Sequence, residues 1–241
     1  MLGSMRNPLR SMVGRIRSGL QDRALRRFYS QFVRPRDLCF DVGANIGNRT
    51  EVFRNLGARV IAIEPQPGCL EALDKAFGQD PEVVIVRKGV AAEPGTLTLS
   101  VCDAAPTIST MAPHWKDGRF GGEFEWARTV EVPVTTLDAL IEEHGTPVFC
   151  KIDVDGFERT VLAGLSRPIP HLSFEFTREF IGEAEACVDR LAGIGAVSVN
   201  CSLGESMSLL LPTWVAPQAL FQRLAELDDP LLWGDIYVRT T

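Results

Sequence analysis

The chain has 241 residues, of which 45% are hydrophobic and 23% charged, a composition typical of one globular domain. This apolar content excludes disorder along the whole chain, and no uncharged apolar run of about 18 residues predicts a transmembrane helix. The net charge is −6, yet residues 1–36 carry nine arginines and a single acid, Asp22. The rest of the chain is therefore strongly acidic, and nucleic acid is not an expected partner.

Residues 1–36 form a basic arm. Its apolar residues recur with the spacing of a helix, first at positions 9, 12, 13, 16 and 20 and then at Leu25, Phe28 and Phe32. We expect an amphipathic helical arm that packs on the main domain, packs on a second copy in a homo-oligomer, or contacts an anionic membrane surface. The main domain is placed at 37–241. No apolar block of signal-peptide length follows the arginines, so secretion is not expected.

Strand and helix signals alternate after the arm. Short apolar strands are predicted at 38–42, 60–63 and 83–86, with helices at 46–56 and 67–77 between them. These strands are continuously apolar rather than alternating, which indicates burial on both faces in a parallel sheet.

The middle of the chain, 96–134, interrupts this rhythm as an insertion. Two half-exposed strands, 96–101 and 129–134, flank a polar loop that we expect to cover a pocket. Beyond it, helices are predicted at 135–138 and onward, 157–165, 181–192 and 216–227, and strands at 148–152, 172–176, 197–201 and 236–239. The pattern predicts an α/β fold with a doubly wound, mostly parallel, Rossmann-like sheet, with the last strand as an antiparallel edge.

The six cysteines include no CxxC pair and no Cys/His cluster with zinc spacing. Cys39 and Cys150 lie inside apolar runs. They are interpreted as small buried hydrophobic residues in a reduced, cytoplasmic setting.

The turn after the first strand, Asp41–Gly47, carries the first chemical signal. It is not the dinucleotide pattern G-x-G-x-x-G, because Asn45 stands where the second glycine would be. An acid at the strand tip, Asp41, suits a positively charged ligand with hydroxyls better than a phosphate. Glu64 ends the second strand, where an acid accepts hydrogen bonds from a ribose diol. Together these features indicate adenosine without phosphates, and therefore S-adenosylmethionine.

Several motifs in order look like those of the FkbM-type methyltransferases: Asp41–Gly47, Ile63–Pro65, Thr136–Asp138, Lys151–Glu158 and Val161–Gly164. The resemblance covers about residues 38–165, and one departure is Asp155, where the family more often has Glu. It implies a class I S-adenosylmethionine-dependent methyltransferase that acts on a hydroxyl of a sugar, glycan or natural-product-type small molecule. The expected cofactor-binding residues are Asp41, Gly43, Ala44, Asn45, Gly47, Glu64, Pro65 and Val90.

A buried strand delivers Asp153 to the edge of the sheet where the sulfonium would lie, so Asp153 is the expected catalytic residue that orients or deprotonates the acceptor hydroxyl. Glu175 and Asp155 are expected on the acceptor side. Asp155 and Glu158 also stand where acids cap a helix. The four acids could hold Mg²⁺ together, but a metal is not favoured.

His114 in the covering loop is the alternative catalytic base, or else a solvated loop histidine. Trp115 and its aromatic neighbours in the insertion, Phe120, Phe124 and Trp126, either stack on a sugar or anchor the loop. Two other functions stay open: an NAD-dependent oxidoreductase, which would need the missing glycine pattern, and a non-catalytic nucleotide-binding or membrane-surface module that uses the arm.

Overall fold

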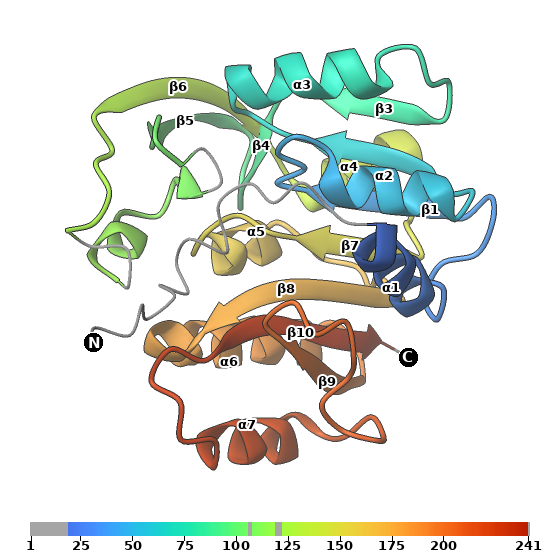
Figure 1. Ribbon diagram of the computed structural model, residues 1–241, viewed down its shortest axis with the longest axis vertical. Helices are drawn as coiled ribbons and strands as arrows, with labels where there is room; N and C mark the ends of the chain where they lie inside the picture. Colours follow the sequence, from blue (N-terminus) through green and yellow to red (C-terminus); the bar gives the residue numbers. More distant parts are fainter. Residues whose placement is uncertain (1–18, 106–107, 119–121, 241) are drawn as a thin grey trace, which may run out of the picture.

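The computed structural model of the chain describes residues 19–105, 108–118 and 122–240 (Figure 1). The strands of the large sheet are β1 (Leu38–Val42), β2 (Arg59–Ile63), β3 (Val83–Val86), β7 (Phe149–Ile152), β8 (His171–Thr177), β9 (Val197–Leu203) and β10 (Trp233–Thr240). They are ordered β3-β2-β1-β7-β8-β10-β9. The predicted fold class is confirmed: the sheet is mostly parallel and Rossmann-like, with helices between its strands.

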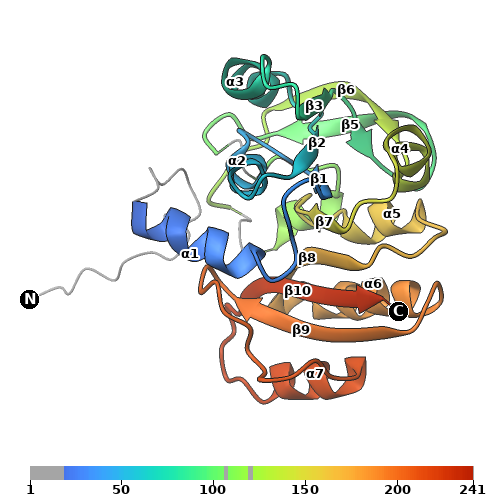
Figure 2. The ribbon, with the colours of Figure 1, turned by 90° about the vertical axis from the view of Figure 1, so that its right-hand side faces the viewer.

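Helices cover both faces of this sheet (Figure 2). They are α1 (Gly19–Tyr29), α2 (Asn48–Asn55), α3 (Pro67–Phe77), α4 (Leu137–His144), α5 (Glu158–Ala163), α6 (Ile181–Ala192) and α7 (Pro217–Ala225). One core joins α4, α5, α6 and α7 to the sheet. A second core on the other face joins α1 and α2 to it.

The order of the strands reverses between β1 and β7. The chain builds outward from β1 through β2 to β3, and then returns to pair β7 with β1 and β8 with β7, all in parallel. The loop that follows β1 and the loop that follows β7 lead away from each other at this point. Open α/β sheets bind their ligands at such a point. The first turn and the segment from Asp153 onward are therefore neighbours.

The expectation that the last strand is a sheet edge is wrong. β10 is antiparallel, as predicted, but it lies between β8 and β9 and pairs with both. β9 forms the edge instead. Gly234 permits this close pairing, because a Cβ there would lie 2.0 Å from the carbonyl oxygen of Ser202 on β9.

A second sheet contains β4 (Gly89–Val90), which precedes the insertion, and the insertion's strands β6 (Arg128–Thr135) and β5 (Gly95–Val101), in that order. β5 and β6 pair in antiparallel fashion. The loop between them contains the 3-10 helix η3 (Pro113–Asp117), and η4 (Arg178–Phe180) follows β8. Phe120 lies outside the described residues.

The described part of the basic arm packs on the domain itself. Phe28, Tyr29 and Phe32 are buried against Phe149 and Tyr237 of the sheet. Residues 1–18 lie outside the described part of the chain, so the expected helix is described only from Gly19 onward. No helix among the described residues has the length and apolar character needed to cross a membrane.

Candidate functional site

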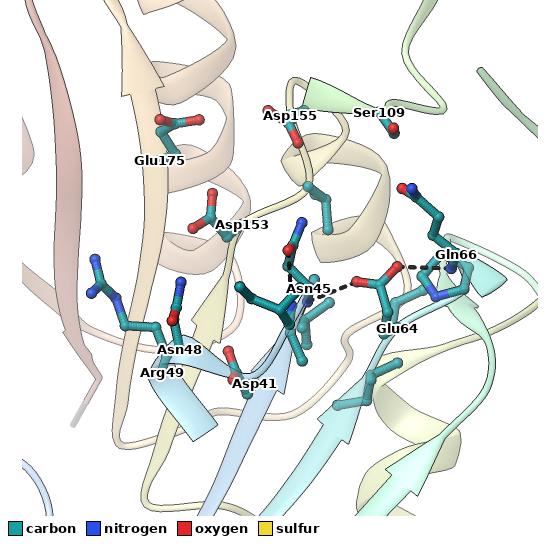
Figure 3. Close-up of a pocket in the computed structure, with 18 of the residues that line it drawn as sticks. Asp41, Asn45, Asn48, Arg49, Glu64, Gln66, Ser109, Asp153, Asp155 and Glu175 are labelled. Atoms are coloured by element: carbon teal, nitrogen blue, oxygen red, sulfur yellow. Dashed lines mark hydrogen bonds between the residues drawn. The ribbon is translucent and has the colours of Figure 1, made fainter. Parts of the chain in front are cut away.

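A cavity of about 380 Å³ lies at the carboxyl ends of β1, β2, β7 and β8 (Figure 3). This cavity is lined by most of the site residues that were predicted from the sequence: Asp41, Gly43, Ala44, Asn45, Glu64, Pro65, Val90, Asp153, Asp155 and Glu175. Three nominated residues are not among those that line it: Gly47, His114 and Trp115.

The floor of the cavity is the turn after β1. Gly43 has φ of 79°, and a Cβ at this position would lie 1.8 Å from the carbonyl oxygen of Asp153. Only glycine allows β1 and β7 to approach so closely here. Gly47 has a different role. It begins α2 with φ of 91°, and a Cβ there would meet the side chains of Phe77 and Leu73 on α3, so this glycine permits helix packing.

Glu64 holds its carboxylate rigidly at the end of β2. Oε2 accepts a hydrogen bond from the backbone N–H of Asn45 and Oε1 one from the N–H of Gln66, each at 2.8 Å. The residue is 6% exposed, and burial raises its pKa to about 7 against the opposing effect of those hydrogen bonds. Each oxygen keeps a lone pair with which it can accept a ribose hydroxyl.

Asp41 lies beneath the same turn. Thr50 of α2 donates a hydrogen bond to its Oδ2 at 2.6 Å, and burial raises the pKa of this carboxyl. The acid thus braces the turn to the helix that follows, and it lines the cavity. Together with Glu64 and the close approach at Gly43, this set of acceptors fits a ligand with ribose hydroxyls and a positive charge.

Asp153 extends from the end of β7, and its side chain is 43% exposed. The fully buried Lys151 lies below it, with Nζ 3.2 Å from Oδ2 of Asp153 and 2.8 Å from Oδ1 of Asp235 on β10. Burial by itself lowers the pKa of Lys151, but the two carboxylates outweigh it and raise that pKa well above the usual value. The lysine therefore stays charged and holds Asp153 in place.

Three further acids, Asp155, Glu158 and Glu175, interact electrostatically with Asp153. Burial, and then the charge of Glu175, raises the pKa of Asp155 well above its usual range, and burial does the same for Glu175. The predicted capping role of Glu158 is wrong, because no side chain among the described residues caps α5: Oε1 of Glu158 instead accepts the N–H of Val154, ahead of the helix, at 3.2 Å, and burial raises the pKa of this carboxyl to about 7. No set of three or more His, Cys, Asp or Glu residues in the described ranges is arranged to hold a metal ion.

The residues of the insertion that line the cavity are not His114 and Trp115, the two that the sequence predicted. Leu99, Ser109 and Met111 reach the cavity from the insertion. The exposed His114 instead packs its ring edge-on against Phe180, with the centroids 5.1 Å apart. Trp115 is buried between Phe180 and Gly156, where a Cβ would lie 2.8 Å from the indole ring. It holds the covering loop on the domain.

Among the lining residues that the sequence did not predict are Arg49, Trp233 and Asp235. Arg49 lies in the first turn of α2, directly after the glycine motif. Its position next to that motif could have predicted that it lines the cavity. The last strand was predicted to begin at residue 236, which left out Trp233 and Asp235. Lys151 was quoted within a motif but given no role, although a lysine inside an apolar strand signals a buried ion pair.

Comparison with known proteins gives a family. The family model described as the methyltransferase FkbM domain matches residues 41–191. Hexuronic acid methyltransferase AglP of Haloferax volcanii is 27% identical over 141 residues, which are 57% of this chain and 54% of that protein. The match thus spans about half the length of this curated relative.

Two solved structures show low similarity. A TehB-like methyltransferase from Corynebacterium glutamicum has a TM-score of 0.46 at 10% identity, with 90% of this chain and 88% of that chain covered. Precorrin-6y C5,15-methyltransferase from Geobacter metallireducens also has a TM-score of 0.46, at 12% identity, with 94% and 90% covered.

Proposed function

Because the chain belongs to the FkbM methyltransferase family, whose cofactor is S-adenosylmethionine, we propose that it methylates a hydroxyl oxygen of a sugar or of a related natural-product-type small molecule. The relative from Haloferax volcanii, named as a hexuronic acid methyltransferase, supports a sugar acceptor. The family match favours a methyltransferase over the oxidoreductase and non-catalytic alternatives.

The observation that carries this proposal is Asp153, a carboxylate held by the buried Lys151 at the mouth of a cavity lined by other acids. Carboxylates accept hydrogen bonds from hydroxyls, so several of them suit an acceptor with many hydroxyl groups. An amine acceptor would arrive charged and would first need to lose a proton.

When bound, S-adenosylmethionine supplies an electrophilic methyl group on a sulfonium. Glu64 would accept the ribose hydroxyls, and Asp41 and the turn at Gly43 would face the amino-acid part. Asp153 would accept the hydrogen bond of the acceptor hydroxyl, hold its oxygen in line with the methyl group, and take the proton during attack. Positioning of this kind and general-base help of about 10²–10⁴-fold are what a weak hydroxyl nucleophile needs.

The test is transfer of a labelled methyl group to a panel of sugars and natural-product alcohols, with the methylated atom identified by NMR. Asp153→Asn should keep the affinity for S-adenosylhomocysteine within about twofold and lower kcat at least about tenfold. Asp103→Asn is a matched control, since this exposed acid of the insertion pairs with Arg128 outside the cavity. Wild-type turnover by Asp153→Asn would remove the residue from the reaction, and a methyl group on nitrogen or carbon would overturn the proposed class of acceptor.

A further inference from the structure

The cavity continues past Asp153 to an end that neither the family match nor the sequence motifs assign. Gly204 and Glu205 follow β9 there, and Trp233 and Asp235 begin β10. All four lie beyond residue 191, where the family match stops. Arg49 of α2 completes this group, which we call the β10 end of the cavity. In Figure 3, Arg49 and Glu64 lie on opposite sides of Asn45, so the β10 end is distinct from the proposed ribose site.

Arg49 is largely buried, with a side chain 14% exposed. Its ion pair with the 65% exposed Glu205 is long, at 3.7 Å between Nη2 and Oε1, and its buried Nε has no hydrogen-bond partner among the described residues. A guanidinium carries five N–H donors in one plane, and donors that are buried without acceptors are costly. The buried Nε is closed to a ligand, but a carboxylate that binds with both oxygens would satisfy the outer Nη donors, whose ion pair with Glu205 is long.

Trp233 gives the same end of the cavity an aromatic wall. The indole is half-buried and lines the cavity, and a Cβ at Gly204 would lie 3.7 Å from its ring. The close pairing of β10 with β9 at Gly234 fixes the backbone that carries it. A rigid aromatic face beside polar groups suits the apolar face of a sugar ring.

We propose that the β10 end binds an acceptor sugar that carries a carboxylate, with Arg49 binding the carboxylate and Trp233 packing on the ring. This inference rests on the proposed function and names its acceptor as a uronic acid. Charge limits where the carboxylate can lie, because most of the charged residues that line the cavity are acids. Arg49 and Lys88 are the cationic residues among the described lining residues. Lys88 precedes Val90 in the chain and belongs to the other end, which leaves Arg49.

The experiment compares paired acceptors that differ only at C6: the p-nitrophenyl glucuronide, galacturonide and mannuronide, each with its neutral hexoside. Methyl transfer from labelled S-adenosylmethionine gives kcat and KM, and calorimetry gives binding of each sugar to the complex with S-adenosylhomocysteine. We expect the wild type to favour at least one uronide over its hexoside about tenfold or more in kcat/KM, which is the discrimination that one well-placed charged hydrogen bond gives.

Three variants give effects of different sign. Arg49→Met should lower kcat/KM for the uronide about tenfold or more and leave the hexoside within about twofold. Arg49→Lys should recover only part of this loss, because lysine lacks the planar pair of donors. Glu205→Gln should raise the affinity for the uronide, since it removes the carboxylate that competes for Arg49. Arg87→Met is the control, because Arg87 pairs with Asp74 outside the cavity.

Each contrary result has its own meaning. Equal methylation of acidic and neutral sugars would overturn the uronic acid inference and leave the proposed function standing. A loss of affinity for S-adenosylhomocysteine in Arg49→Met, with equal losses for both sugars, would assign Arg49 to the carboxylate of the cofactor and overturn the inference too. No transfer to any sugar, with no binding by calorimetry, would overturn the sugar acceptor itself.

Discussion

The ammonium group of Lys151 lies 2.8 Å from the carboxylate of Asp235, although 84 positions separate the two residues in the chain. The contact ties β7, which carries the proposed catalytic acid, to the antiparallel strand β10. Because the same ammonium also contacts Asp153, one buried cation sets the position of two carboxylates that line the cavity. The order of the strands thereby bears directly on the chemistry.

Replacing Lys151 by methionine should destabilise the protein by about 3–5 kcal/mol, because the change leaves Asp235 buried without its cation. Chemical denaturation measures the free energy of unfolding. Adding Asp235→Asn to the variant should recover part of the loss, since the unpaired charge is then gone. Lys75→Met, at an exposed position of α3, is the control. An unchanged stability of Lys151→Met would show that the ion pair contributes nothing net.

The affinity for S-adenosylhomocysteine should depend on pH through Glu64. Its pKa in the folded protein is about 7, and the ionised carboxylate is the better acceptor for ribose hydroxyls. Affinity should therefore fall about tenfold between pH 8 and pH 6. Glu64→Gln should flatten this dependence, and Glu64→Ala should cost about 2–4 kcal/mol of binding at pH 8. Calorimetry at several pH values measures both, and a wild-type profile without slope would exclude Glu64 from the ribose site.

The ligand-free protein should become less stable as the pH rises from 5 to 8. The carboxyl pKa values of Glu64 and Glu158 are raised from 4.5 to about 7, so the folded state binds more protons than the unfolded state in this range. The stability that these protons supply is complete below about pH 4.5 and is lost as the pH passes about 7. Each group contributes about 3 kcal/mol at most.

Thermal unfolding at pH 5.5, 7 and 8 checks this sign. The thermal midpoint should fall by several degrees as the pH rises, because about 1 kcal/mol of stability corresponds to about 2–4 °C for a chain of this size. A double variant, Asp155→Asn with Glu175→Gln, should raise the midpoint at pH 8 and flatten the profile, because it removes two half-buried carboxyls with raised pKa values. A midpoint that rises with pH would contradict the assignment.

Gly43→Ala should abolish cofactor binding. The new Cβ would lie 1.8 Å from the carbonyl oxygen of Asp153, at a φ of 79° that alanine rarely adopts, so β1 and β7 would have to separate. Gly68→Ala is the matched control, because no atom lies within 4 Å of the Cβ at that position of α3. Calorimetry with S-adenosylhomocysteine should give no heat for the first variant and an unchanged affinity for the second.

Deletion of residues 1–33 should destabilise the domain strongly, although we place the domain boundary only after residue 36. The deletion removes Phe28, Tyr29 and Phe32, which pack against Phe149 and Tyr237. Burial of each large side chain contributes about 1.5–3 kcal/mol. Deletion of residues 1–18 removes none of the described contacts and serves as the comparison. Equal thermal midpoints for the two truncated proteins would show that α1 is dispensable.

Local signals in the sequence determined most of the secondary structure. The helices predicted at 67–77 and 181–192 and the strand predicted at 83–86 have the bounds of α3, α6 and β3. Apolar runs closed by glycine or proline depend on nearby residues alone, so they can be read along the chain. The same holds for the turn at Gly43 and for Glu64, whose places follow directly from the ends of two strands.

Only the tertiary structure decided which side chains from distant segments come together at the cavity. The insertion of β10 between β8 and β9 brings Trp233 and Asp235 to the cavity, while η4 draws His114 away from it to Phe180. These placements depend on strand pairing and packing between segments far apart in sequence. The local sequence around a residue does not predict such contacts. The sequence by itself thus determined the elements, the family and the cofactor, and three-dimensional packing determined which charges face one another around the proposed acceptor.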